Sequence, residues 1–192
     1  MGWYAIFVMT GKEERVKEEI DRILSICDPP ITYQLIIAKR EINERKNGNI
    51  RSVIKKMFPG YILLETDNVL KFYHLTRQCN YLIDILRHGE YFSEIKLEEI
   101  ANIVYMVDDD GIIGNSDIYV ENDRIIVTKG PLKNYDGFVK KIDKRKRRIT
   151  VLFFFNNKEH YIDLSINIIE KFDDKKIGKK IPFFAYRYYQ LK

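Results

Sequence analysis

The chain has 192 residues, of which 45% are hydrophobic and 32% are charged, so it can bury a core in one large or two small domains. No stretch approaches the roughly 18 consecutive apolar residues that a membrane span requires. Residues 1–10 also lack the cationic start and small-residue cleavage site of a secretory signal. These features argue against a membrane protein and predict a cytoplasmic one.

The charge is divided unevenly along the chain. Residues 1–119 hold 15 Lys and Arg against 19 Asp and Glu, whereas residues 120–192 hold 18 against 9. A basic C-terminal part on a mildly acidic N-terminal part predicts that the former contacts a polyanion. A lysine-rich solvated surface is the simpler interpretation, but it does not explain the division.

The N-terminal residues predict a strand followed by a helix. Large apolar residues alternate from Trp3 to Met9, as in a half-buried strand. Thr10-Gly11-Lys12-Glu13 has the pattern of a capping box, and an apolar stripe from Val16 to Cys27 follows it. Pro29-Pro30 then ends the helix.

Residues 31–65 are predicted to form strands. The segment from Lys39 to Lys46 is charged and alternating, and Asn47-Gly48 supplies a hairpin turn, so we expect a charged arm that points outward. The return strand leads into Phe58-Pro59-Gly60-Tyr61. Proline favours an extended Phe58, and Gly60 permits a tight deviation, so two aromatic residues flank a kink close to the arm.

In the rest of the chain, the predicted secondary structure changes near residue 109 from mixed helix and strand to short strands. Helices are predicted over 69–76 and 97–107 with a strand over 81–86 between them, and the acidic, glycine-containing stretch that follows is typical of a linker. Beyond it, short apolar segments separated by turns about every 10 residues predict a small barrel.

Neither the histidines nor the cysteines form a catalytic or metal-binding pattern. The histidines are scattered, no nucleophile elbow or phosphate-binding loop is present, and the acidic run at 108–110 lacks the spacing of a calcium loop. Cys27 and Cys79 lie in apolar contexts without a CxxC pair, which favours buried thiols over a disulfide or a zinc site. We therefore expect a non-enzymatic protein with no cofactor and no metal.

Three motifs, in this order and spacing, resemble the NusG family of transcription elongation factors: Trp3-Tyr4, Phe58-Pro59-Gly60-Tyr61, and Lys129-Gly130-Pro131-Leu132 with Asp136-Gly137, the pattern of a KOW motif. The resemblance covers residues 3–172. It implies an α+β fold in which an α/β sandwich, an NGN-like antiparallel sheet with helices, precedes a small SH3-like β-barrel. The expected divisions are 1–108 for the first domain, 109–119 for the linker, 120–172 for the barrel and 173–192 for a tail.

The resemblance also implies a site. In the family, an aromatic surface of the first domain binds the β′ clamp helices of RNA polymerase. Trp3 is equally consistent with a core position. The matching residues here are Trp3, Tyr4, Met9, Phe58, Pro59 and Tyr61.

The barrel carries an uninterrupted basic run, Lys144-Arg145-Lys146-Arg147-Arg148, at a turn between two strands. Five cations cannot share a core, so they must be exposed, and other cations of the barrel support them. A solvated loop is the plain interpretation and phosphate contact the functional one. The candidate RNA-binding residues are Lys129, Lys133, Lys140, Lys141, Lys144, Arg145, Lys146, Arg147 and Arg148.

So basic a barrel, with Asn156 where generalist members have an exposed Phe for Rho or a ribosomal protein, resembles specialised LoaP-type antiterminators. This implies a monomeric antitermination factor that binds RNA polymerase and an RNA hairpin in the nascent transcript. DNA of the transcription bubble is a further candidate partner, and no membrane is involved. Two alternatives stay open: a generalist NusG-like factor whose barrel recruits proteins, and a ribosome-associated KOW protein. The aromatic tail segment 181–189 is equally consistent with packing on the barrel and stacking on bases.

Overall fold

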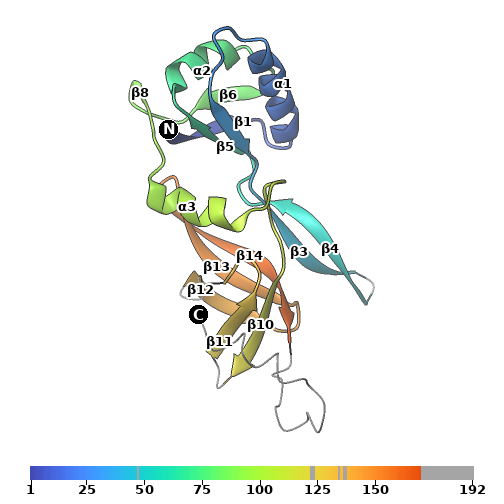
Figure 1. Ribbon diagram of the computed structural model, residues 1–192. Helices are drawn as coiled ribbons and strands as arrows, with labels where there is room; N and C mark the ends of the chain where they lie inside the picture. Colours follow the sequence, from blue (N-terminus) through green and yellow to red (C-terminus); the bar gives the residue numbers. More distant parts are fainter. Residues whose placement is uncertain (47, 122–123, 134, 136–137, 170–192) are drawn as a thin grey trace, which may run out of the picture.

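The computed structural model of the chain describes residues 1–46, 48–121, 124–133, 135 and 138–169 (Figure 1). Asn47 of the predicted hairpin turn, Asp136-Gly137 of the predicted KOW motif and the predicted tail lie outside the described residues. Within the described part, no helix is both long enough and apolar enough to span a membrane.

An antiparallel sheet forms the centre of the N-terminal domain. Successive side chains of β1 alternate between its two faces, so that Ala5 joins one hydrophobic core and Ile6 the other. The strands lie in the order β2-β5-β1-β6, with bounds β1 (Gly2–Val8), β2 (Tyr33–Ile36), β5 (Tyr61–Thr66) and β6 (Leu82–Ile85).

Two helices, α1 (Glu13–Ser25) and α2 (Val69–Thr76), cover one face of this sheet. The predicted apolar stripe of α1 is confirmed, since Val16, Ile20 and Leu24 are all buried against it. The helix ends four residues before Pro29.

The third helix, α3 (Leu97–Met106), lies on the opposite side of the sheet, between it and the C-terminal barrel (Figure 1). Its Ile100 and Ile103 are fully buried in a hydrophobic cluster that also contains Ala5 of the sheet and Ile149 and Phe155 of the barrel. The two domains therefore share one continuous core on this side.

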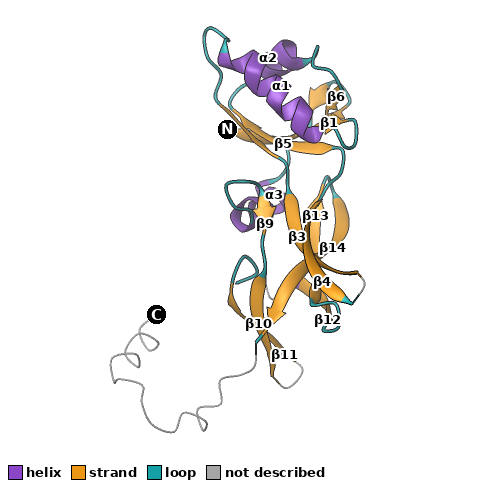
Figure 2. Ribbon diagram, turned by 90° about the vertical axis from the view of Figure 1, so that its right-hand side faces the viewer, coloured by secondary structure: helices purple, strands orange, loops and turns teal. Residues whose placement is uncertain are grey.

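A long hairpin extends from the N-terminal domain beside the barrel (Figure 2). Its strands β3 (Lys39–Lys46) and β4 (Asn49–Lys56) pair antiparallel, as predicted, and the short β9 (Ile112–Ile113) pairs parallel with β3. A second small hairpin consists of β7 (Arg87–His88) and β8 (Tyr91–Phe92).

The barrel is a curved five-stranded sheet in the order β11-β10-β14-β13-β12. Gly130 at the KOW turn has φ +100°, and an added Cβ would lie 2.7 Å from the backbone of Asn115 and Ser116, so the turn requires glycine. The predicted two-part fold class is confirmed. The strands are β10 (Ser116–Glu121), β11 (Arg124–Lys129), β12 (Val139–Asp143), β13 (Arg148–Phe155) and β14 (Lys158–Ile168).

Three sequence expectations differ from the structure. The predicted capping box is wrong: Lys12 takes the N-cap position without a side-chain cap bond. Glu13, the acidic residue of that box, turns inward toward Gly60 instead.

The two cysteines differ in burial. Cys27 is only half-buried, whereas Cys79 is buried, and burial raises the pKa of its thiol to about 11, with Glu19 acting in the same direction. Residues 109–119 contain β9 and the beginning of β10.

Candidate functional site

The kink at Phe58-Pro59-Gly60-Tyr61 is held in place from α1. Gly60 has φ +84°, a conformation that favours glycine, and its backbone N–H donates to Glu13 Oε1 at 2.8 Å. Lys56 Nζ donates to the other oxygen of the same carboxylate at 2.6 Å. Glu13 is fully buried, so one charged group fixes both the strand before the kink and the turn itself.

The pKa of Glu13 is lowered: burial acts to raise it, but the hydrogen bonds from Lys56 and Gly60 outweigh burial. A lowered pKa means that this carboxylate stabilises the fold fully above its ordinary value of 4.5. That contribution is lost as the pH falls from 4.5 through the lower value of the folded state.

We expect Glu13→Ala to reduce the free energy of unfolding by about 3 kcal/mol, because it leaves Lys56 and the Gly60 N–H without their buried partner. Urea denaturation at neutral pH measures the change, and a series from pH 7 to acid should show the two stability curves converging below the ordinary pKa of 4.5. Glu14→Ala is the matched control, since Glu14 also pairs with Lys56, at 2.7 Å, but is exposed and should cost less than about 1 kcal/mol. Equal losses in the two variants would contradict this role of Glu13.

The aromatic residues of the kink face the barrel. The ring centroid of Phe58 lies 4.5 Å from that of Phe155, at the end of β13, and 5.2 Å from the His160 ring, which stands perpendicular to it. Tyr61 meets Phe155 edge-on at 5.4 Å. Phe58 is only 5% exposed, so the barrel covers the residue that the sequence singles out most strongly.

The other residues of the expected aromatic surface are dispersed. Trp3 is 9% exposed and belongs to the shared core, where Ile95 bridges to it, while Tyr4 lies on the opposite face against the α1 and α2 side. Met9 is 50% exposed at the end of β1, and Pro59 is exposed. Of the six expected residues, only Phe58 and Tyr61 have rings that meet the same partner, Phe155.

Phe7 belongs to the aromatic surface around Tyr61, although none of the sequence motifs includes it. It is opposite Tyr61 in the β1–β5 register, with ring centroids 5.4 Å apart, and is 37% exposed. The alternation of β1 contains the signal, because Phe7 shares the face of Trp3 and Ala5.

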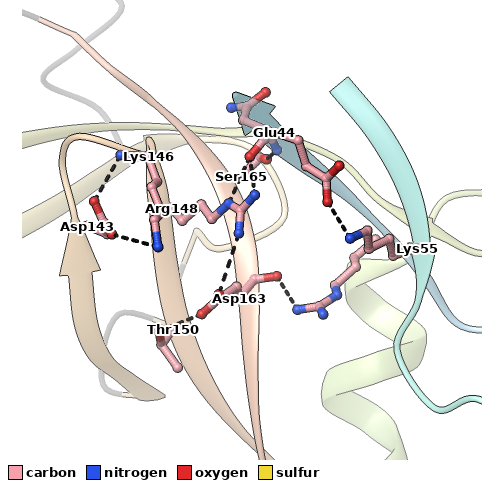
Figure 3. Close-up of polar contacts among 10 residues, drawn as sticks. Glu44, Lys55, Asp143, Lys146, Arg148, Thr150, Asp163 and Ser165 are labelled. Atoms are coloured by element: carbon pink, nitrogen blue, oxygen red, sulfur yellow. Dashed lines mark hydrogen bonds and ion pairs between the residues drawn. The ribbon is translucent and has the colours of Figure 1, made fainter. Parts of the chain in front are cut away.

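Polar contacts join the hairpin to the barrel at the other end of β13 from Phe155. Figure 3 shows Arg148, Asp163 and Ser165 of the barrel beside the hairpin that carries Glu44 and Lys55. Arg148 Nε and Nη2 both donate to the Asn43 carbonyl, the former at 2.8 Å, and the Asn43 N–H donates to Ser165 Oγ at 2.6 Å. We call these contacts, together with those of Phe58, the domain interface.

Arg40 adds a costly element to the domain interface. Its Nη1 donates to the Asp163 carbonyl at 2.5 Å, but its buried Nε has no partner among the described residues. Burial lowers the pKa of Arg40; Asp163 opposes this shift and Arg148 reinforces it. Arg40 thus bonds the backbone carbonyl of Asp163, whereas the carboxylate of that residue lies 4.0 Å from Arg148. A partly satisfied buried charge weakens such an interface.

The basic residues predicted to bind RNA do not all have the same environment. The four cations of the β12–β13 turn, residues 144–147, are exposed, and Lys146 reaches Asp143 at 3.8 Å. Arg148 is half-buried and engaged with Asn43. The remaining candidates are exposed around the barrel: Lys129, Lys133, Lys140 and Lys141.

A family model described as "Transcription termination factor nusG" matches residues 1–104, more than half of the chain. The chain belongs to the NusG family. NusG of Rickettsia typhi is 28% identical over 173 residues, covering 89% of this chain and 90% of that protein, and NusG of Staphylococcus aureus strain Mu50 is 26% identical, covering 88% and 94%.

The solved structure described as "Domain interaction in Thermotoga maritima NusG" has the same fold, with a TM-score of 0.53 and 21% identity over 85% of this chain and 93% of that chain. The chain is accordingly a NusG-like transcription termination/antitermination factor and not an enzyme. The sequence expectation of a non-enzymatic transcription protein is confirmed.

Proposed function

We propose that this chain is a specialised antitermination factor, of the LoaP type, which binds RNA polymerase through its N-terminal domain and an RNA hairpin through its barrel. The single observation that carries the polymerase contact is the Phe58-Pro59-Gly60-Tyr61 kink. A buried carboxylate holds its shape, and its aromatic rings meet a second apolar surface. A rigid aromatic patch of this kind is the usual anchor of a protein interface.

The β′ clamp helices would replace the barrel on Phe58 and Tyr61, with Phe7 and Met9 at the exposed margin. Because Phe58 is covered by Phe155 and His160, polymerase binding requires the barrel to move away first. The apparent affinity then falls in proportion to the fraction of molecules that are open. The under-satisfied Arg40 makes opening easier, since separation of the domains returns its guanidinium to water.

The barrel's role rests on charge. The exposed turn at residues 144–147 is the densest cationic segment of the chain and lies beside the hairpin. A groove of about 440 Å³ there is lined by Arg145, Lys146 and Arg148 of the barrel and by Asn43, Glu44 and Ile50 of the hairpin, and Glu44 is paired with Lys55. Phosphates would position the barrel, and bases exposed in a loop or bulge would give sequence preference, because the major groove of a regular RNA helix is closed to side chains.

The polymerase contact is tested with purified core RNA polymerase and the full chain. We expect stoichiometric binding that an isolated clamp-helix fragment of β′ abolishes in competition. Binding that the fragment leaves unchanged would place the contact elsewhere on polymerase. Absence of polymerase binding, combined with co-sedimentation with ribosomes, would favour a ribosome-associated KOW protein instead.

A further inference from the structure

A groove of about 580 Å³ lies on the N-terminal domain, away from the domain interface residues. One wall is α1, with Glu14, Lys17 and Glu18, and the other is the acidic loop after α3, beside Lys39. The five carboxylates of these walls outnumber the two lysines, and Lys17 is already paired with Asp21. The floor of the groove is apolar, formed by Leu35–Ile37 of the sheet edge and by Val104 and Val107. An apolar floor between acidic walls suits a cationic segment with apolar side chains.

The acidic walls are only partly neutralised. Glu14 pairs with Lys56, and Asp108 accepts the backbone N–H groups of Asp110 and Ile112. Among the described residues, no ion pair involves Glu18, Asp109 or Asp110. The groove therefore presents unpaired carboxylates next to buried apolar surface.

We propose that the groove binds the C-terminal segment of the same chain, residues 175–192. This segment has six Lys and Arg and no acidic residue, and its centre, Ile181-Pro182-Phe183-Phe184-Ala185-Tyr186, is apolar and aromatic. Its charge complements the walls, and its apolar centre matches the floor. The proposal does not depend on polymerase or RNA binding.

The chain after Ile169 is long enough to bring the C-terminal segment to the groove. The Ile169 N–H donates to the Ile118 carbonyl, and Ile118 is eight positions after Asp110 at the groove, so these two points are at most about 28 Å apart. Residues 170–178 span up to about 30 Å, so residues 179–192 can occupy the groove even at that greatest separation, and a shorter separation lets Lys175 and Lys176 reach its acidic walls as well. Since the segment starts from the barrel and the groove belongs to the N-terminal domain, its binding adds a second link between the domains.

The test compares full-length chains by backbone amide NMR. In the variant with Lys175, Lys176, Lys179 and Lys180 changed to Gln, the amide signals of Glu18, Val107 and Gly111 should shift, and added salt should move the wild-type signals the same way. Neutralising the exposed Arg51, Arg77, Lys96 and Lys158 is the matched control and should not reproduce the shifts. Unchanged groove signals in the tail variant would overturn the proposal.

A synthetic peptide of residues 175–192, titrated into the tail variant, identifies the site directly. It should shift the same groove signals, and Glu18→Gln with Asp109→Asn and Asp110→Asn should weaken it roughly tenfold. The exposed acids Asp67, Glu90 and Glu98, neutralised together, should leave peptide affinity unchanged. Shifts confined to the barrel, or wild-type shifts that grow with protein concentration as for a neighbouring molecule's tail, would each contradict an intramolecular site.

Discussion

Phe155→Ala is expected to tighten polymerase binding by about tenfold, because it removes the barrel ring that covers Phe58 and so raises the open fraction. In this opened background, a further Phe58→Ala should weaken binding by about 30-fold, the roughly 2 kcal/mol typical of an aromatic anchor. The two substitutions create similar holes in one interface yet change polymerase affinity in opposite directions.

The adjacent Phe154→Ala is the control for Phe155, since Phe154 is 43% exposed and has no aromatic contact with Phe58 among the described residues. It should leave the affinity unchanged. Near-ultraviolet circular dichroism and thermal unfolding establish that each variant stays folded. If Phe155→Ala and the Phe58/Phe155 double variant bind polymerase equally, Phe58 is interface packing alone and is not part of the polymerase site.

The order of elements and both domains could be predicted because they depend on local patterns. The stripe of α1, the alternation of β1 and the regular turns of the barrel each reflect a periodicity that adjacent residues determine. The sequence does not predict β10, because Ser116-Asp117-Ile118-Tyr119 follows a polar stretch. The strand pairs with the adjacent β11 and also with β14, about 50 residues further along the chain.

The site was harder to predict, because its geometry depends on contacts between distant residues. Glu13 matches a capping pattern, yet the half-buried Lys56 and the Gly60 N–H are better partners than its own helix terminus. Tyr4 follows Trp3 in the motif, but strand alternation puts the two on opposite faces, which the sequence could have indicated. No local pattern marks Phe155 as the partner of Phe58.

The basic run illustrates the same limit. The sequence does not distinguish the five consecutive cations from one another. In the structure, however, the last of them, Arg148, begins β13 and donates to the Asn43 carbonyl of the hairpin. Arg148 therefore has a structural partner in the closed arrangement, whereas the four residues before it are exposed. A test of RNA binding should neutralise those four and leave Arg148 in place, so that the domain interface is preserved.

We expect the RNA affinity of the full-length chain to fall by about two orders of magnitude near 0.1 M salt when four residues of the basic turn, Lys144, Arg145, Lys146 and Arg147, are changed to Gln. If these side chains meet about four phosphates, log affinity of the wild type should fall against log salt with a slope of roughly −3 to −4, or about tenfold per doubling of salt. The variant's slope should be nearly flat. Fluorescence anisotropy over a salt series, with RNA hairpins selected from host transcripts, measures both quantities.

Neutralising the exposed Arg15, Arg77, Lys96 and Lys158 removes the same charge elsewhere and should shift the slope little, because counterion release reports contacts and not net charge. Polymerase binding should survive the four-residue change in the basic turn, because the aromatic surface lies in the other domain and Arg148 still holds Asn43. A wild-type chain that prefers no hairpin over its scrambled sequence, or a variant with an unchanged slope, would remove the RNA-guided mechanism. The barrel would then act as in a generalist NusG-like factor, by recruiting proteins.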